Sequence, residues 1–298
     1  MIRISLFFVL LGFTALGFAA GETGLAVLKV GVGARATAMG EAFVATADDA
    51  SGVYWNPAGS VWIPQRQAHF THNSWIQGIN HNVASLTFPT QYGSFGIGLL
   101  LNNIDGFESR TIASKEPTGT FSSHDFSMSL NYSRKLNENL SVGANFKYIN
   151  KKIYIESANG YMIDVGARYL TPVHGLTVAG TVQNLGFTTK MVTEKIRLPQ
   201  TLRIGASYDL PFGQFEDKLL LAADYVQIFD EATHINVGAE IRPISVMALR
   251  AGYQTGFDEK DLSAGFGLHL DWLNIDYAYV PFGRDLGDSH RFSVTTTF

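Results

Sequence analysis

The sequence has 298 residues, of which 16% are charged and 12% aromatic, with 30 glycines, no cysteine and a formal net charge of −4. The charged share is well below the roughly 25% of ordinary soluble domains, and the absence of cysteine excludes disulfides and a lipoprotein anchor. The charges form no blocks, so nothing indicates a nucleic-acid partner. This composition is typical of a lipid-facing β-barrel, although a soluble β-sandwich shares part of it.

The chain begins with a predicted secretory signal peptide. Arg3 supplies a positive start, residues 4–18 form an apolar core, and small residues follow at 19–21. The apolar stretch is short for a membrane anchor, and no later stretch approaches the roughly 18 apolar residues of a spanning helix. The predicted organisation has three parts: a signal peptide at 1–20, an N-terminal hatch or plug segment at 21–65 and an outer-membrane barrel at 66–298.

The N-terminal segment is rich in small residues. The run Val30–Phe43 predicts a short, slim helix around Arg35–Glu41 that can pack inside a barrel. Asp48 and Asp49 follow, and then comes the sequence YWNPAG at 54–59, in which Asn-Pro starts a turn and the Asn side chain can act as a cap. An ordinary polar N-terminal arm is the alternative interpretation.

From about residue 66 onward, apolar and polar residues alternate in segments of roughly ten residues. Because side chains alternate across a strand, each segment has one apolar face and one small or polar face. The count is about fourteen strands, near 66–73, 79–88, 93–103, 122–134, 139–151, 159–170, 175–184, 200–210, 217–228, 233–242, 245–254, 261–270, 272–280 and 288–298.

The charged residues follow the same alternation. In a soluble sandwich the polar face meets bulk water and usually carries Lys, Glu and Thr. Here it carries Gly, Ser, Asn and both signs of charge, as in an enclosed wet lumen. We therefore predict an all-β fold: a transmembrane antiparallel up-and-down β-barrel of about 14 strands with a small N-terminal plug in its lumen. The predicted lumen-facing charges are Lys147, Asp164, Arg168, Arg203, Asp224, Glu240, Arg250 and Asp276.

The connections and the C-terminus agree with this prediction. Short connections alternate with longer ones, as expected when both barrel ends face the periplasm. The predicted periplasmic turns are Pro89–Tyr92, Lys135–Glu138, Thr171–His174, Pro211–Glu216, Pro243–Ile244 and Asp271–Trp272. The longer connections are Ile104–Phe121, Leu185–Pro199, Thr255–Lys260 and Pro281–Gly287. The last strand ends on Phe298, a terminal aromatic of the kind that barrel-insertion machinery recognises.

We find no pattern for catalysis, a cofactor or a metal. The sequence GVGARA at 31–36 superficially fits a dinucleotide fingerprint, but no βαβ unit follows it. His69 and His72 have opposite parity on a strand and cannot share an ion locally. His124 and Ser127 also have opposite parity, and no Gly-x-Ser-x-Gly or His-Glu-x-x-His motif occurs. We expect a protein without enzymatic activity.

A family resemblance adds to these observations. The run Gly31–Gly59, with GARA, MGEAFVA, ADDAS and YWNPAG, resembles the N-terminal signature of the PorV/PorQ outer-membrane family, which belongs to the FadL-type barrel superfamily. The sequence THNSWI at 71–76 resembles that family's first hairpin. The resemblance implies that the N-terminal segment closes the lumen as a hatch, with its acids and arginine pairing against lumen charges. It assigns the hatch or gating role to Arg35, Asp48, Asp49, Asn56, Pro57 and Ala58.

The resemblance supports two functions. PorV-type members serve type IX secretion, so our first expectation is a component of, or shuttle for, protein secretion and cell-surface attachment, with a translocon or exported proteins as partners. The alternative is a FadL-type passive transporter of hydrophobic small molecules, such as long-chain fatty acids or hydrocarbons. A purely structural barrel is a third possibility. In each case we expect the outer membrane of a diderm bacterium, contact with its lipid and insertion by the barrel assembly machinery. The short loops depart from the best-studied members.

Overall fold

The computed structural model describes residues 23–75, 78–110, 116–211, 218–229, 231–256, 260–284 and 286–298. The predicted signal peptide at 1–20 lies outside the described residues, and so does most of the predicted turn Pro211–Glu216. Within the described chain, no helix is long and apolar enough to cross a membrane.

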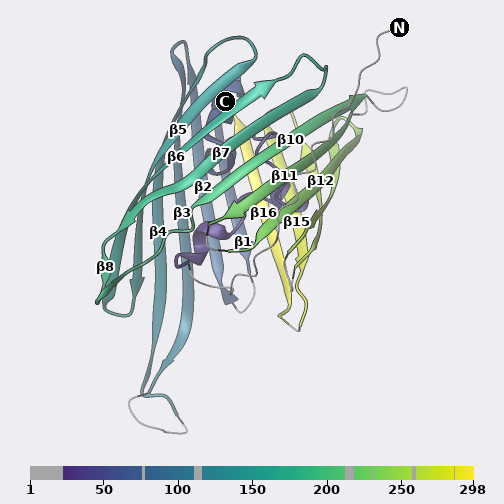
Figure 1. Ribbon diagram of the computed structural model, residues 1–298. Coiled ribbons are helices and arrows are strands. Elements are labelled where there is room, and N and C mark those ends of the chain that lie inside the picture. Colours follow the sequence, from purple (N-terminus) through teal and green to yellow (C-terminus); the bar gives the residue numbers. More distant parts are fainter. Residues whose placement is uncertain are drawn as a thin grey trace.

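Fourteen strands of the described chain form a closed antiparallel barrel (Figure 1). Each strand pairs with the next barrel strand in the sequence, and β1 pairs with β16 to close the ring. The predicted fold class is therefore confirmed. The barrel strands are β1 (Gln67–Ser74), β2 (Asn80–Thr90), β3 (Gly93–Ser109), β4 (Gly119–Lys135), β5 (Leu140–Ile153), β6 (Glu156–Leu170), β7 (Leu176–Thr188), β10 (Thr201–Pro211), β11 (Lys218–Ile228), β12 (Thr233–Ile244), β13 (Met247–Gln254), β14 (Leu262–His269), β15 (Leu273–Pro281) and β16 (Asp288–Thr297).

Side chains alternate between the two faces of this wall. In β4, Ser127 and Ser129 are buried, whereas Met128 and Leu130 are 38% and 48% exposed. An exposed apolar residue at every second position is costly in water but suits contact with lipid. The outer face is therefore the lipid-facing one, and the small inner side chains leave room in the lumen.

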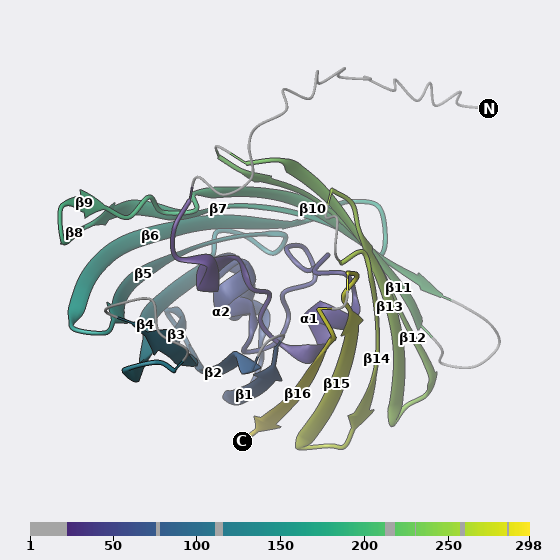
Figure 2. The same cartoon turned by 90° about the horizontal axis from the view of Figure 1, so that it is seen from below.

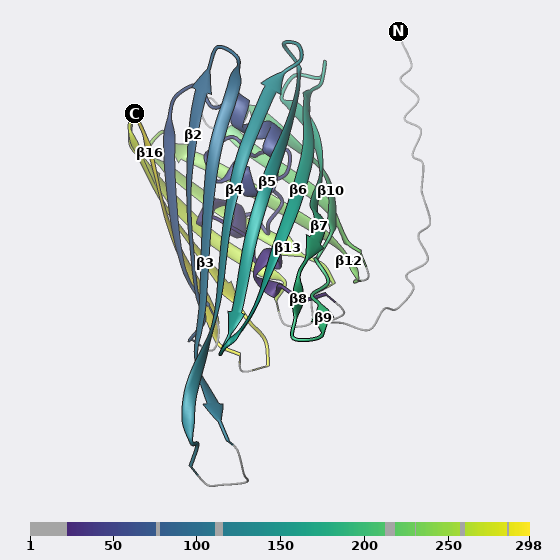
Figure 3. The same cartoon turned by 90° about the vertical axis from the view of Figure 1, so that its left-hand side faces the viewer.

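The connection between β3 and β4 differs from the prediction. We expected a loop over Ile104–Phe121, but β3 extends to Ser109 and β4 begins at Gly119, and the resulting hairpin projects beyond the rest of the barrel (Figure 3). The register shifts between Ile104 and Phe107, and Phe107 then stacks on Phe121 with 5.2 Å between ring centroids. The shift interrupts the alternation, so the pattern that predicts strands fails there.

The expected connection Leu185–Pro199 is also partly ordered. β7 continues to Thr188, and a small two-stranded sheet follows, formed by β8 (Lys190–Met191) and β9 (Glu194–Lys195). This sheet lies at the same end of the barrel as the projecting hairpin (Figure 3). We take that end as external, because the opposite end carries the short turns and both ends of the barrel sequence.

Residues 23–65, here called the plug, lie inside the ring of strands (Figure 2). The plug contains the 3-10 helices η1 (Ala26–Lys29) and η2 (Pro57–Trp62) and the short helices α1 (Ala34–Ala38) and α2 (Gly52–Trp55). The helix expected around Arg35–Glu41 is α1, and it ends earlier than predicted. Gly40 and Glu41 have φ angles of 63° and 61°, which a right-handed helix cannot contain.

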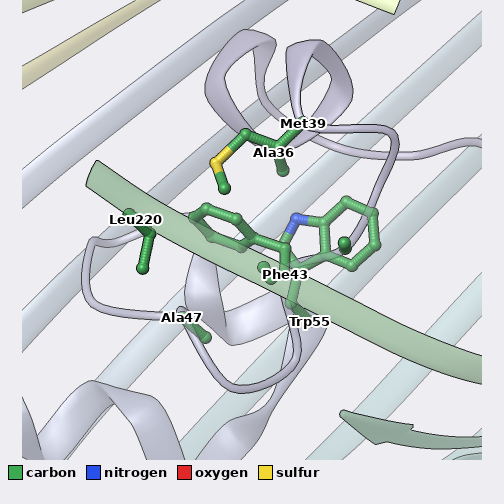
Figure 4. Close-up of a cluster of buried hydrophobic side chains, with 8 residues drawn as sticks. Ala36, Met39, Phe43, Ala47, Trp55 and Leu220 are labelled. Atoms are coloured by element: carbon green, nitrogen blue, oxygen red, sulfur yellow. The ribbon is translucent and has the colours of Figure 1, made fainter. Parts of the chain in front are cut away.

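The plug has an apolar core of its own, completed by the wall. Phe43 and Trp55 pack edge to face, with 5.9 Å between ring centroids. Met39 lies against Phe43, and Leu220 of β11 covers the cluster from the wall (Figure 4). Apolar burial of this kind contributes about 25 cal/mol per Å². It holds together a segment whose helices are too short to be stable alone.

Candidate functional site

Charged side chains, most of them buried, link α1 to strands β12, β13 and β15. Nε of Arg35 lies 2.8 Å from Glu240, and Nη1 lies 2.5 Å from Asp48. Arg250 lies 2.6 Å from Glu240 and 2.7 Å from Asp276. Burial would lower the pKa of Arg35, but the carboxylates of Asp48 and Glu240 raise it well above its usual value. We call these five residues, with Arg242, the charge network.

The adjacent residues Asp48 and Asp49 interact mainly with other residues of the plug. Asp48 and Asp49 both face Arg35 of the same segment, at 2.5 Å and 3.7 Å. Asp49 also accepts hydrogen bonds from the backbone N–H and the hydroxyl of Ser51. The two acids therefore pair with Arg35 of their own segment, and the hatch role that the resemblance assigns to them remains a prediction. Arg35 is the one that reaches the wall, at Glu240.

Asn56 connects two parts of the plug with the wall. Its Oδ1 accepts a hydrogen bond from the N–H of Ala58 at 3.0 Å, which caps η2. Its Nδ2 donates to the carbonyls of Val44 in the plug and Ala167 in β6, at 3.1 Å and 3.2 Å. The capping role expected for this side chain is present, and the contact with β6 is additional.

Pro57 and Ala58, which follow Asn56, are held by hydrogen bonds to their backbone carbonyls. The carbonyl of Pro57 accepts a hydrogen bond from Asn131 of β4 at 3.2 Å, and that of Ala58 accepts one from Ser141 of β5 at 2.9 Å. A Cβ at Gly143, also in β5, would lie 2.4 Å from the Pro57 carbonyl oxygen. The Asn-Pro-Ala turn is therefore fixed against three neighbouring strands.

The predicted lumen charges lie on the inner face, and half of them contact the plug: Arg168, Arg203, Asp224 and Glu240. Asp224 accepts hydrogen bonds from the N–H groups of Phe43 and Val44 at 2.8 Å and 2.9 Å. Nε of Arg168 donates to the carbonyl of Ala45 at 3.0 Å. Sequence alternation gives the face of such residues but does not identify these backbone partners.

Lys147 and Asp164 pair with each other, and Arg203 lies against an aromatic ring of the plug. Lys147 of β5 pairs with Asp164 of β6 at 2.8 Å and donates to Asn184 of β7 at 2.5 Å. The guanidinium of Arg203 lies 5.0 Å from the ring centroid of Trp55.

Hydrogen bonds from side-chain amides of the wall to carbonyls of the plug were not predicted from the sequence. Asn145 of β5 donates to the carbonyl of Val53, and Gln183 of β7 donates to the carbonyls of Tyr54 and Trp55. Asn and Gln at inward positions are the only signal that could have indicated them.

A second group of apolar side chains lies on the inner wall, apart from the cluster around Phe43 and Leu220. Val83, Leu100, Ile149 and Met162 point inward and are buried. They pack against apolar side chains of the plug, and Ile196 and Leu198 from the connection between β9 and β10 add to the cluster. The plug residues of this cluster are Leu25, Val27, Leu28, Val32 and Tyr54. We call this the apolar region.

A cavity of about 50 Å³ adjoins the apolar region, between the plug and strands β3, β5, β7 and β10. Its apolar walls include Val27, Val32 and Leu100, and its polar walls include Lys147 and Arg203. Below the plug, towards the short turns, lies a second cavity of about 250 Å³ that is lined mainly by charged residues. The two cavities therefore differ in character: the first has mixed apolar and polar walls, and the second has mainly charged walls.

Phe298 lies at the end of the barrel with its side chain exposed. Its N–H donates to the carbonyl of Arg66, next to the start of β1. Its role as a signal for barrel insertion remains a prediction.

Comparison with protein families identifies the relatives of the chain. Residues 17–168 match the family described as "Uncharacterised protein family (UPF0164)". The chain belongs to UPF0164. No curated protein matches the sequence.

Solved structures extend the comparison along the whole barrel of this UPF0164 protein. The Pseudomonas putida toluene transporter TodX is 14% identical with a TM-score of 0.61, and the match covers 90% of this chain and 99% of that one. A TodX deltaS2S3 mutant, described as a monoaromatic hydrocarbon channel, is 13% identical with a TM-score of 0.61 and the same coverage. A Pseudomonas aeruginosa FadL homologue is 14% identical with a TM-score of 0.55, covering 95% and 99%. The UPF0164 chain therefore has the fold of FadL-type outer-membrane barrels.

Proposed function

We propose that this protein carries hydrophobic small molecules passively across the outer membrane. The apolar region is the observation that supports this proposal most strongly. Pockets for small molecules are mainly apolar with a few polar groups that fix orientation, and the cavity beside Leu100 combines both. Barrels of the same fold include a toluene transporter and a monoaromatic hydrocarbon channel.

The cavity is small as it stands, so binding requires part of the plug to move. Ligand pockets usually measure about 300–1,000 Å³, whereas this cavity measures about 50 Å³. The 3-10 helix η1 fills much of the space beside it. Residues before and in η1 contact the external loops, through Lys29 with Glu231 at 2.9 Å and Gly24 with the carbonyl of Arg197 at 3.0 Å. We infer that η1 is the mobile element.

The energies of the contacts support this choice. Partly exposed ion pairs such as Lys29–Glu231 contribute about 0–1 kcal/mol. Removing one partner of a buried charge network costs about 3–5 kcal/mol, and Arg35 of α1 belongs to such a network. Displacing η1 therefore breaks weaker charged contacts than displacing α1, and a bound apolar ligand would replace the apolar contacts of Leu25 and Val27. In this proposal residues 21–65 act as a hatch, with the Arg35 and Asn56 contacts holding its fixed part.

The wall offers one place for a sideways exit from the cavity. Pairing between β2 and β3 is continuous, whereas the register between β6 and β7 shifts between Ile163 and Val165. Asn184 lies at this shift with a φ angle of 61°, and Gln183 and Asn184 also line the cavity. A ligand leaving sideways there would break the fewest ladder hydrogen bonds.

Leu100→Trp should reduce uptake by filling the cavity, while the barrel still assembles. Leu101→Trp is the matched control, because Leu101 lies on the lipid-facing side of the same strand. We expect uptake of radiolabelled naphthalene or oleate by cells to fall at least fivefold with the first variant and to remain unchanged with the second. Equal uptake by both variants and the parent would contradict the proposal.

The secretion role expected first from the sequence has less support. It rests on the resemblance of residues 31–59 to PorV/PorQ, and the apolar region has no part in it. Affinity purification from detergent distinguishes the two functions. Recovery of a translocon or of exported proteins with a shared C-terminal domain would favour secretion, and a barrel without such partners would count against it.

A further inference from the structure

A histidine, a serine and an asparagine lie together on the lipid-facing surface, near the external ends of β1 and β2. His72 and Ser74, the last residue of β1, are two positions apart and both exposed. Phe70 of the same strand is 49% exposed and faces lipid, so His72 and Ser74 face outward with it. Asn82 of β2 lies directly opposite His72. Transport through the lumen does not involve these three residues, which we call the outer triad.

The imidazole of His72 is held in one orientation by Asn82. Its Nδ1 lies 2.7 Å from Oδ1 of Asn82. Because an amide oxygen only accepts hydrogen bonds, Nδ1 carries the proton and Nε2 keeps a free lone pair. In this tautomer a histidine can act as a general base towards a neighbouring hydroxyl.

Ser74 supplies a hydroxyl on the same face of the same strand. Its Cα lies about 7 Å from that of His72, because each strand residue adds about 3.3–3.4 Å. The two side chains leave the strand side by side, and their combined length spans this distance. Within the described chain, the hydroxyl of Ser74 has no hydrogen-bond partner, so it is available to donate to Nε2. Nucleophile, base and orienting amide then have the roles of a Ser-His-Asn triad.

The residue opposite Ser74 is suited to stabilise negative charge. Asn80 of β2 pairs with Ser74 in the ladder, so the two side chains are neighbours on the outer face. Nδ2 of Asn80 donates one hydrogen to the carbonyl of Gly78 at 3.3 Å and has a second one. Such an amide can donate to the oxyanion that forms when a hydroxyl attacks a carbonyl group.

Another histidine also lies opposite Ser74, but its tautomer is not fixed. His290 of β16 pairs with Ser74 on the other side of β1. Its Nδ1 lies 2.8 Å from the hydroxyl of Tyr277. A phenol hydroxyl both donates and accepts, so this contact does not decide which ring nitrogen carries the proton. His72 is therefore the better oriented base.

A second histidine–asparagine pair on the outer wall provides a comparison. Nδ1 of His124 in β4 lies 2.9 Å from Oδ1 of Asn103 in β3, also near the external end. Ser122 is two positions from His124, but the register shift leaves it without a partner residue in β3. Within the described wall, Ser122 therefore has no counterpart of Asn80.

We propose that the outer triad hydrolyses acyl esters of lipids in the external leaflet. The site opens to lipid, and the exposed rings of Phe70 and Phe292 lie on the same face, Phe292 directly opposite His72. These rings suit acyl chains, and the polar end of the wall suits the ester group at the membrane–water interface. We expected no enzymatic activity from the sequence, because only the pairing of β1 with β2 brings Asn82 to His72.

The reaction is an acyl transfer to serine followed by hydrolysis. Oγ of Ser74 forms a bond to the ester carbonyl carbon while Nε2 of His72 takes the hydroxyl proton. The bond between that carbon and the alcohol oxygen then breaks, and the imidazolium gives its proton to the alcohol. Water attacks the acyl-serine with the same base, which releases a carboxylic acid and restores Ser74. One ester and one water thus give one acid and one alcohol.

Release of oleate from dioleoylphosphatidylcholine in mixed detergent micelles tests this activity on the whole protein. We expect Ser74→Ala and His72→Ala each to lower the initial rate at least hundredfold, as loss of a general base does. Asn82→Ala should lower kcat at least tenfold with KM unchanged, and Asn82→Asp, which keeps an acceptor for Nδ1, should restore most of the activity. The double variant His124→Ala/Asn103→Ala is the matched control and should keep the parent rate. The diether analogue of the lipid, which has no ester, should release nothing.

A fluorophosphonate probe tests the nucleophile independently of the lipid. We expect a covalent adduct on Ser74, located by peptide mass spectrometry, that His72→Ala abolishes. Heat-modifiable migration in gel electrophoresis checks that each barrel is folded. An adduct without ester hydrolysis would overturn the proposed substrate, and loss of activity in His290→Ala but not in His72→Ala would overturn the assignment of the base. Equal rates in the folded parent, Ser74→Ala and the control would overturn the proposal, whatever the uptake experiments show.

Discussion

Replacing Gly252 with valine should displace the plug and turn the closed barrel into a leaky pore. A Cβ at Gly252 would lie 1.9 Å from the backbone nitrogen of Gly40, and one at its cross-strand neighbour Gly238 would lie 2.3 Å from the carbonyl oxygen of Met39. Both obstacles are backbone atoms, so no side-chain rotation relieves the clash. Overpacking of this kind costs about 1–3 kcal/mol.

Conductance in planar lipid bilayers measures this effect. We expect the Gly252→Val barrel to show frequent openings and its host cells to become sensitive to a large hydrophilic antibiotic. Gly119→Val is the control, because no atom lies within 4 Å of a Cβ at Gly119. A Gly252→Val barrel as closed as the parent would show that the plug does not seal the lumen through this contact.

Replacing Glu240 with alanine should loosen α1 more than any surface substitution. The carboxylate of Glu240 lies within 3 Å of Arg35, Arg242 and Arg250. Its loss removes the carboxylate between the guanidinium groups of Arg35 and Arg250, which keep only Asp48 and Asp276 on their far sides. We expect a cost of about 3–5 kcal/mol. At about 1.4 kcal/mol per tenfold change, amide hydrogens of α1 should exchange at least one hundredfold faster.

Hydrogen exchange followed by mass spectrometry checks this expectation. Glu108→Ala is the control, because Glu108 pairs with Arg110 on the exposed hairpin, and such surface pairs contribute about 0–1 kcal/mol. Glu240→Gln keeps the size of the side chain and should give an intermediate result. Unchanged exchange in α1 of the Glu240→Ala protein would mean that other contacts hold the hatch.

The strands could be predicted because a barrel wall has lipid on one side and a confined interior on the other. Because of this difference, apolar and polar residues alternate along each strand. The alternation predicts that Lys147, Asp224 and Glu240 face the interior of the barrel. It fails at Phe107, where a register shift changes the face of the following residues. The extended hairpin therefore could not be read from the pattern.

The partners of the inner residues could not be predicted, because they depend on where the plug lies. Asp224 accepts hydrogen bonds from two backbone N–H groups, and Arg168 donates to a backbone carbonyl. No sequence pattern indicates either partner. Val83 and Ile149 lie on the inner face of the wall, where most residues are polar. The alternation of the sequence therefore does not indicate what these two apolar side chains contact. Their role emerges only once the apolar side chains of the plug are seen to pack against them.

X-ray diffraction from crystals soaked with 1-bromonaphthalene tests most directly whether the apolar region binds hydrophobic molecules. The bromine scatters anomalously, so its position can be found without ambiguity. We expect a peak inside the barrel between η1 and the side chains of Leu100 and Ile149, with η1 displaced from its place in Figure 2. Bromine found only on the lipid-facing surface, with η1 unmoved, would contradict a ligand site in the lumen.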